Sequence, residues 1–282
     1  MVLIAVLWSI ALLSALAMAA SMTFRGFAGI MAVERNKLQA QGLLTAGLEI
    51  AAGAIESLGD APLNEIEITV NLSTGSVRAR LSDEGGRIDI GKAPVEVLVA
   101  LFRYIGAQEA AGTEIAQRIV EQRRPTPDDR AGGADRPFTD VRQLARVPGM
   151  EPEWVRAVAP LTTVFGNATV NPLTAPAEVI AALPGVDQGR LDVFLQTRRN
   201  LGDASMLGAT LGATQRYLQV NAQQVVSVHL AATLVDGYTD AAQVIIVRLP
   251  QDTQPYRVLV WDPLPSSYSP LVRVDPCVSP RF

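Results

Sequence analysis

The chain begins with MVLIAVLWSIALLSALAMAASMT (Met1–Thr23), and no charged side chain occurs before Arg25. About 20 consecutive apolar residues are the length that a helix needs to cross the hydrocarbon core of a bilayer. A helix also satisfies every backbone polar group within its own segment, as the bilayer interior requires. We therefore expect a transmembrane helix over residues 1–23. Its expected anchor residues are Val2, Leu3, Ile4, Ala5, Leu7, Trp8, Leu12, Leu13 and Leu16.

Two other structures are compatible with an apolar N-terminal run. A cleaved signal peptide has a basic start, a shorter apolar core and a small-residue cleavage site. Ala17, Ala19 and Ala20 resemble such a site, but no basic residue precedes the apolar run. A buried core helix is the other alternative. The length of the run favours the membrane helix over both.

Beyond Arg25 the helical pattern continues into a half-polar segment, from Gly26 to Leu58. Its apolar residues recur at the spacing of one helix face. They are Leu43, Leu44, Leu48, Ile50, Ala51, Ile55 and Leu58. Gly59-Asp60 followed by Pro62 predicts the end of the helix, because glycine and then proline commonly follow a helix C-terminus. One long N-terminal helix, apolar in its first half and amphipathic in its second, is typical of pilin-like subunits.

Three stretches carry a family resemblance: the hydrophobic start Met1–Ile4, SDEGGRIDIGKAP (Ser82–Pro94) and LARVPGM (Leu144–Met150). With these, most of the chain resembles the minor pseudopilin K family of the type II secretion system, a group of type IV pilin-like proteins. Most pilin-like relatives carry Glu where this chain has Ala5, and pseudopilin K characteristically lacks it. Relatives are made with a short basic leader ending in glycine. Either Met1 is not the true start, or the sequence stands for the mature form.

The resemblance implies an α+β fold, in which a pilin-like long N-terminal helix packs on an antiparallel sheet. A large all-helical domain, similar to sterile-alpha-motif or helix-hairpin-helix folds, would be inserted between the strands. The implied protein is a single-pass inner-membrane subunit with its bulk in the periplasm. It would cap the tip of the pseudopilus and help initiate its assembly, so that folded proteins are exported across the outer membrane. Implied partners are the other minor pseudopilins (I and J types) and the major pseudopilin, with a prepilin peptidase as processing enzyme.

Two regions show the alternation or the β-branched composition of strands. The first is a predicted hairpin around the turn Ser73-Thr74-Gly75, and the second lies near the C-terminus. The expected strands are residues 66–72, 77–81, 225–233, 242–249 and 256–261. We predict that they form one antiparallel sheet within a pilin-like body made of residues 24–91 and 219–282.

Residues 92–218 form the predicted inserted helical domain, and a repeat marks it. Ile88-Asp89 followed by APVEVLVAL (Ala93–Leu101) matches Val170-Asn171 followed by APAEVIAAL (Ala175–Leu183). In both copies Pro and then Glu should fall in the first turn of a helix. Proline's missing N–H costs nothing there, and the helix dipole favours an acid. Further helices are expected at residues 112–124, 139–159 and 187–200, with a loop at 124–137.

Two Pro-Gly turns stand out in this block, Pro148-Gly149 and Pro184-Gly185. They resemble helix-hairpin-helix turns, in which backbone N–H groups at a helix N-terminus hold a phosphate. In the other interpretation they are tight helix connectors. Glu151 and Asp187 follow the turns and would repel a phosphate, which favours the connector.

The alternative function is a membrane-tethered DNA receptor of the competence type, with Arg146 and Arg190 as phosphate contacts and Arg198 and Arg199 nearby. Phosphate binding needs clustered Lys and Arg. The chain has 24 basic and 28 acidic residues and a net charge of −4. We therefore expect no nucleic-acid partner.

Composition and motifs argue against an enzyme. Cys277 is the single cysteine, so neither an intrachain disulfide nor a thiolate metal site is expected. His229 is the single histidine and lies in an alternating run, where an ordinary strand residue is the simpler interpretation. A lone histidine seldom makes an active site without a nucleophile or carboxylate fixed beside it. We predict no catalytic residues.

Calcium is the one cofactor that the resemblance implies, and acidic loops supply oxygen ligands for it. The candidates are Asp236 with Asp240, and the group Asp128, Asp129 and Asp135. None has the spacing of a recognised calcium loop, and a solvated loop is the alternative for each.

The N-terminal helix is the expected partner-binding element. We predict contacts with other minor pseudopilins on or near Leu38, Leu44, Leu48 and Ile55. Part of this stripe must face the chain's own sheet, because a lone helix is only marginally stable without packing. An exposed apolar strip would mark the remainder as an interaction site.

Overall fold

The computed structural model describes most of the 282 residues. The described residues are 2–59, 61–63, 65–123, 138–198, 210–220, 225–249 and 254–264, without the side chains of residues 2, 5, 19–26 and 28 in the first helix. Helices are combined with an antiparallel sheet, so the predicted α+β class is confirmed.

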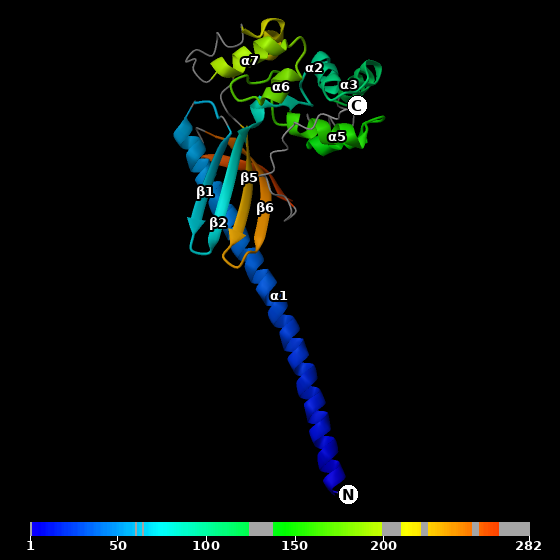
Figure 1. The fold of residues 1–282 in the computed structure, drawn as a ribbon, viewed down its shortest axis with the longest axis vertical. Coiled ribbons are helices and arrows are strands. Elements are labelled where there is room, and N and C mark those ends of the chain that lie inside the picture. Colours follow the sequence, from blue (N-terminus) through cyan, green and yellow to red (C-terminus); the bar gives the residue numbers. More distant parts are fainter. Residues whose placement is uncertain are drawn as a thin grey trace.

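A single helix, α1 (Val2–Leu58), leads from the N-terminus into the folded body, and its first half projects away from it (Figure 1). The helix ends where the sequence predicts. Gly59 follows it with φ +56°, a left-handed conformation that glycine adopts without steric cost. The carbonyl oxygen of Gly59 accepts a hydrogen bond from Arg248 Nη1 at 2.9 Å, which ties the end of the helix to the sheet.

Five strands form one antiparallel sheet in the order β1-β2-β5-β6-β7. The strands are β1 (Ile66–Leu72), β2 (Gly75–Asp83), β5 (Val225–Leu234), β6 (Thr239–Arg248) and β7 (Tyr256–Leu264). The predicted hairpin is present, with Leu72 opposite Gly75. β2 pairs directly with β5 although the whole helical block separates them in sequence, with Asp83 opposite Val226. β1 and β7 are the edges.

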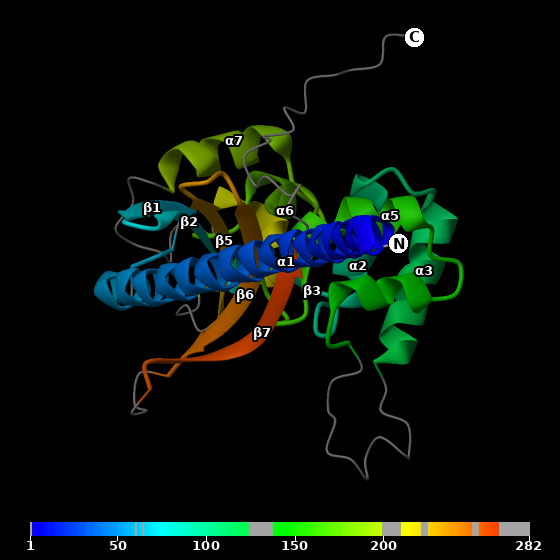
Figure 2. The same ribbon diagram turned by 90° about the horizontal axis from the view of Figure 1, so that it is seen from below.

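The second half of α1 packs across one face of this sheet, over β2, β5 and β6 (Figure 2). Leu44, Leu48 and Ile55 of the helix pack with Leu81 and Val228 of the strands in one hydrophobic core. The helix contributes residues at i, i+4 and i+11 on one face, and the strands contribute every second residue. Burying each such side chain contributes about 1.5–3 kcal/mol.

Short helices fill the segment between β2 and β5, with 3-10 helices written η. In order they are η1 (Glu84–Gly86), β3 (Ile88–Asp89), α2 (Val95–Tyr104), α3 (Glu109–Gln122), η2 (Val141–Arg146), α5 (Pro152–Val158), η3 (Ala159–Leu161), β4 (Thr162–Thr163), α6 (Ala177–Ala181), α7 (Gln188–Thr197) and η4 (Gly212–Tyr217). The repeated prolines lie one position earlier than predicted. Pro94 and Pro176 are the N-cap residues of α2 and α6, and both have extended ψ of 152°.

The helical block has a hydrophobic core of its own, separate from the one beneath α1. Phe102, Ile119, Leu144 and Phe194 are fully buried in it. β3 and β4 pair in parallel, which joins the start of the block to its middle. The division into a sheet body and an inserted domain at 92–218 stays a prediction, and the two separate cores support it.

Candidate functional site

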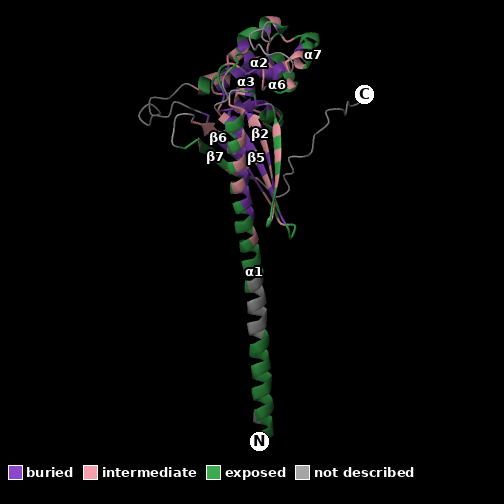
Figure 3. Ribbon diagram, turned by 90° about the vertical axis from the view of Figure 1, so that its left-hand side faces the viewer, coloured by how far each residue is buried: buried purple, intermediate pink, exposed green. Residues whose placement is uncertain are grey.

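The first half of α1 exposes a long apolar surface (Figure 3). The predicted anchor residues with described side chains are 58% to 78% exposed, namely Leu3, Ile4, Leu7, Trp8, Leu12, Leu13 and Leu16. The side chains of Val2 and Ala5 lie outside the description. A contiguous apolar surface of this kind marks a site of contact with a membrane or with another protein.

A membrane crossing is not confirmed. Within the part of the chain that the structure describes, no helix combines the length and the apolar character that a membrane span needs. Part of the predicted span 1–23 lies outside the described side chains.

The predicted partner-binding stripe on the second half of α1 is largely wrong. Leu44, Leu48 and Ile55 are only 2–3% exposed and belong to the core between α1 and the sheet. The periodicity marks one apolar face here, and the chain's own sheet covers it. Leu38 is 67% exposed, and its predicted contact with a partner subunit stays a prediction. Exposed apolar residues precede it in α1 at Phe27, Ile30, Met31 and Val33.

A second exposed apolar surface, which was not predicted from the sequence, lies on the edge strand β7. Val258, Leu259 and Trp261 are 40–45% exposed. Their signal in the sequence is the unbroken run VLVW at 258–261, where a strand with one solvated face should alternate. Edge strands with exposed apolar residues tend to bind other chains.

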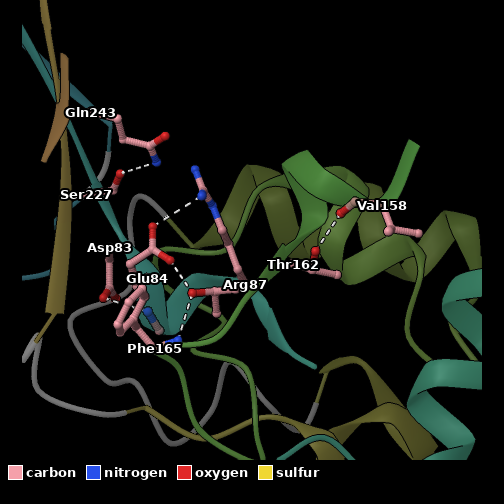
Figure 4. Close-up of polar contacts among 10 residues, drawn as sticks. Asp83, Glu84, Arg87, Val158, Thr162, Phe165, Ser227 and Gln243 are labelled. Carbon is pink, nitrogen blue, oxygen red and sulfur yellow. Dashed lines mark hydrogen bonds and ion pairs between the residues drawn. The ribbon is translucent and has the colours of Figure 1, made fainter. Parts of the chain in front are cut away.

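The motif at Ser82–Pro94 forms the junction between the sheet and the helical block (Figure 4). Asp83 is buried at the end of β2, and its Oδ1 accepts a hydrogen bond from the Gly85 N–H at 2.9 Å. Its Oδ2 accepts from Thr174 Oγ1 (2.7 Å) and Asn171 Nδ2 (3.3 Å), which belong to the second copy of the repeat. Burial raises the pKa of Asp83, and these hydrogen bonds oppose the rise.

Glu84 makes a second junction contact. Its Oε1 accepts from Arg87 Nη1 at 3.2 Å, and its Oε2 accepts from Thr163 Oγ1 of β4. The same hydroxyl oxygen accepts from the Phe165 N–H at 3.0 Å. On the sheet side, Gln243 Nε2 donates to Ser227 Oγ at 3.2 Å (Figure 4). The Glu84–Thr163 contact joins the residue that follows β2 to β4 of the helical block, whereas the Gln243–Ser227 contact lies within the sheet. These contacts include no nucleophile activated by a base.

The sequence repeat is also a structural repeat. Arg123 is the C-cap residue of α3, and its Nη1 donates to the carbonyl oxygen of Ala93 at 2.7 Å. Arg198 is the C-cap residue of α7, and its Nη1 donates to the carbonyl oxygen of Ala175 at 2.6 Å. Ala93 and Ala175 are equivalent in the two copies. Both arginines therefore close a helix pair onto its starting segment, a role that the unequal spacing hid in the sequence.

The two Pro-Gly turns contain glycines in the left-handed region, Gly149 with φ +81° and Gly185 with φ +75°. A third turn of this kind, which sequence analysis missed because it lacks proline, has Gly106 with φ +91°. In each case an N-cap residue follows two positions later; these are Gln108, Glu151 and Asp187. The turns thus share one connector geometry.

Contacts around the turns oppose phosphate binding. The Pro148 carbonyl oxygen accepts from Arg118 Nη1 at 2.5 Å, and that of Pro184 accepts from Thr214 Oγ1 at 3.0 Å. Asp187 Oδ1 accepts from the Arg190 N–H at 3.0 Å and so places a carboxylate at the N-terminus of α7. Arg198 is engaged internally, and Arg199 lies outside the described residues. The structure does not support the DNA-receptor interpretation.

The described calcium candidates, Asp236 and Asp240, do not assemble a site. Among the described residues, no group of three or more His, Cys, Asp or Glu side chains could hold a metal ion. Asp236 accepts from Asn36 Nδ2 at 2.6 Å and from the Tyr238 N–H at 3.0 Å, and Asp240 accepts from the Ala241 N–H. These carboxylates serve a turn, so Asp236 and Asp240 do not fit a calcium site. Asp128, Asp129, Asp135 and Cys277 lie outside the described residues.

His229 lies in β5, as expected for a strand residue. Burial lowers its pKa to about 4, and the nearby Arg87 and Arg80 lower it further in the same direction. The imidazole is therefore neutral at physiological pH. Arg80 is the residue opposite it on β2.

Comparison with known proteins finds likeness to solved structures. No family model and no curated protein matches the chain. The chain is similar to a chain in the crystal structure of the GspK-GspI-GspJ complex from the enterotoxigenic Escherichia coli type 2 secretion system. The sequence identity is 15%, the TM-score is 0.64, and the match covers 84% of this chain and 99% of that chain. The chain thus shares the fold of a protein from a pseudopilin complex of type II secretion.

Proposed function

We propose that the chain is a minor pseudopilin of a type II secretion system, of the pseudopilin K kind, and that it caps the tip of the periplasmic pseudopilus. The observation that carries the proposal is the 57-residue helix α1, whose first half exposes apolar side chains and whose second half packs on an antiparallel sheet. We propose that this arrangement is pilin-like. The shared fold with the GspK-GspI-GspJ structure supports it.

Exposed apolar surface of this extent must be covered in the cell, since burying each large apolar side chain is favourable by about 1.5–3 kcal/mol relative to leaving it in water. We propose that the first half of α1 is buried in two successive environments. The inner membrane holds it before assembly, with the rest of the chain in the periplasm. The helices of neighbouring pseudopilins hold it in the filament.

The position of the helical block supports the tip location. The block lies at the end of the molecule away from the N-terminus of α1 (Figure 1). Pilin-like subunits stack along their long helices. A bulky block at the upper end of α1 leaves no room for another subunit above it, so the subunit fits at the end of a filament.

Complex formation tests the proposal. The full chain would be co-expressed with the I-type and J-type minor pseudopilins of the same genome, extracted in detergent, and analysed by size-exclusion chromatography with light scattering. We expect one complex that contains all three chains. Elution of the full chain alone, under conditions in which the I-type and J-type subunits bind each other, would contradict the proposal.

A further inference from the structure

The edge strand β7 extends the face on which α1 lies, and α1 does not cover it. Trp261 is opposite Val244 and Val258 is opposite Ile246, across a β-bulge. Directly opposite residues of an antiparallel pair point to the same face. Val244 and Ile246 are buried in the core beneath α1. Trp261 and Val258 therefore face the α1 side, yet they are 40% and 45% exposed.

The position of α1 explains this exposure. The helix packs on β2, β5 and β6, and β7 lies to one side of it (Figure 2). Helices pack at interaxial distances of about 8–10 Å, and strands lie about 4.8 Å apart. A second helix beside α1 would therefore lie over β6 and β7. Such a helix would bury Trp261 and Val258 in the same way as α1 buries Val244 and Ile246.

An acidic side chain borders this surface. Tyr256 Oη of β7 donates a hydrogen bond to Glu49 Oε1 of α1 at 2.8 Å, which places Glu49 within reach of the strand. Glu56 follows seven residues later and shares its helix face, because two turns of helix separate them. Both glutamates are exposed. They are also the only charged residues from Leu38 to Leu58.

This charge distribution distinguishes between possible occupants. A helix that carries Lys or Arg beside an apolar stripe would pair with Glu49 and Glu56 at the border of the surface. The same segment of a second copy is acidic and would be repelled. A β-strand added to the edge of β7 would use backbone hydrogen bonds and would leave Trp261 and Val258 exposed on the face of the sheet.

We propose that the β7 surface, made of Val258 and Trp261 and bordered by Glu49 and Glu56, binds an amphipathic helix of a partner subunit that carries basic residues beside its apolar stripe. This inference rests on the proposed function, because it assigns the partner-binding face of the same subunit. It replaces the predicted stripe of Leu44, Leu48 and Ile55, which the chain buries itself.

The experiment uses the full chain in detergent and measures its binding to the purified I-type and J-type pseudopilins, each alone, by fluorescence anisotropy. The first variant is Val258→Thr with Trp261→Thr, which keeps residues of high β-propensity on an edge strand. The second is Glu49→Gln with Glu56→Gln, which removes both charges and keeps an acceptor for Tyr256. Matched controls are Val193→Thr on α7, and Glu109→Gln with Glu121→Gln on α3, all at exposed positions.

We expect the β7 variant to weaken binding of one partner at least tenfold, while its melting temperature stays within a few degrees of wild type. The glutamine variant should weaken binding severalfold and reduce its dependence on NaCl, since salt screens exposed charge pairs. The controls should bind like wild type. Wild-type affinity and salt dependence in both the β7 variant and the glutamine variant would overturn the inference and leave the proposed function intact.

Two further outcomes would also overturn the inference. Failure of the wild-type chain to bind either pseudopilin would contradict the proposed function and the inference together. A wild-type dimer in sedimentation that Trp261→Thr dissociates would show that a second copy occupies the surface.

Discussion

Asp83 at the end of β2 accepts a hydrogen bond from Thr174, 91 residues later, at 2.7 Å. This contact joins the sheet to the second copy of the helical repeat. Asp83 is buried, so its carboxylate depends on such donors for the solvation that water would otherwise supply. The junction is therefore a place where small changes should have measurable effects on stability.

Thr174→Val removes the hydroxyl and keeps the shape of the side chain. A buried acceptor that loses a partner costs about 1–3 kcal/mol, so the melting temperature should fall. The loss should be smaller at pH 4 than at pH 7, because the donor favours the charged form of Asp83. The pKa of Asp83 is higher in the folded protein than in the unfolded chain, so protonation of Asp83 stabilises the fold. This stabilisation is fully present below the unfolded-state pKa and is lost as the pH rises through the folded-state pKa. Thermal unfolding at both pH values measures this, with the half-buried Thr113→Val on α3 as control. An equal loss at both values would contradict the account.

His229→Gln should reduce the acid sensitivity of the fold. The pKa of about 4 in the folded protein is below the ordinary histidine pKa of 6.5. The stability linked to neutral His229 is therefore fully present above pH 6.5 and is lost as the pH falls through 4. The total corresponds to roughly 3 kcal/mol. Urea unfolding of both proteins from pH 7 to pH 4 measures the difference. If both proteins lose stability in parallel, the buried imidazole is not responsible.

Two glycines of α1 should respond oppositely to alanine. A Cβ on Gly47 would lie 2.6 Å from Val77 Cγ2 in the core, whereas one on Gly53 meets nothing within 4 Å. Overpacking of a core costs about 1–3 kcal/mol, so Gly47→Ala should lower the melting temperature. Gly53→Ala should raise it, because alanine in a helix interior is more stable than glycine by about 0.5–1 kcal/mol. Equal shifts in the two variants would mean that α1 does not pack on the sheet as described.

Replacing residues 84–225 by Asn-Gly should leave a folded sheet body. Asp83 and Val226 are opposite each other in β2 and β5, and Asn-Gly forms the two-residue turn that connects such strands. We expect strand-rich circular dichroism and a cooperative thermal transition for the shortened chain. A chain without any transition would show that the sheet needs the helical block, and that the predicted division at 92–218 is not a domain boundary.

Local patterns predicted the elements of this fold well. The apolar spacing from Leu43 to Leu58 predicted the helix, and Gly59 predicted its end, because both depend on residues close in sequence. Alternation located the strands for the same reason. The stripe of Leu44, Leu48 and Ile55 was assigned to a partner wrongly, since periodicity shows that a face is buried without showing what covers it.

The missed features depend on contacts between distant residues. The roles of Arg123 and Arg198 follow from carbonyl groups 30 and 23 residues away. Tyr256 and Glu49 are 207 residues apart. Trp261 and Val258 became visible as a surface once the position of α1 over β2, β5 and β6 was known. Gly106 carried a local signal, but without proline beside it the turn was overlooked.

The most direct test of the central claim is the secretion of a type II substrate by cells that lack this chain. We predict that deletion of its gene leaves the substrate in the periplasm, and that the wild-type gene restores its appearance in the medium. The variant Leu12→Arg should fail to restore it, because a charge at the centre of the apolar half of α1 costs about 2.5–3.5 kcal/mol in a membrane. Undiminished secretion in the deletion strain would contradict the assignment of the chain as a minor pseudopilin.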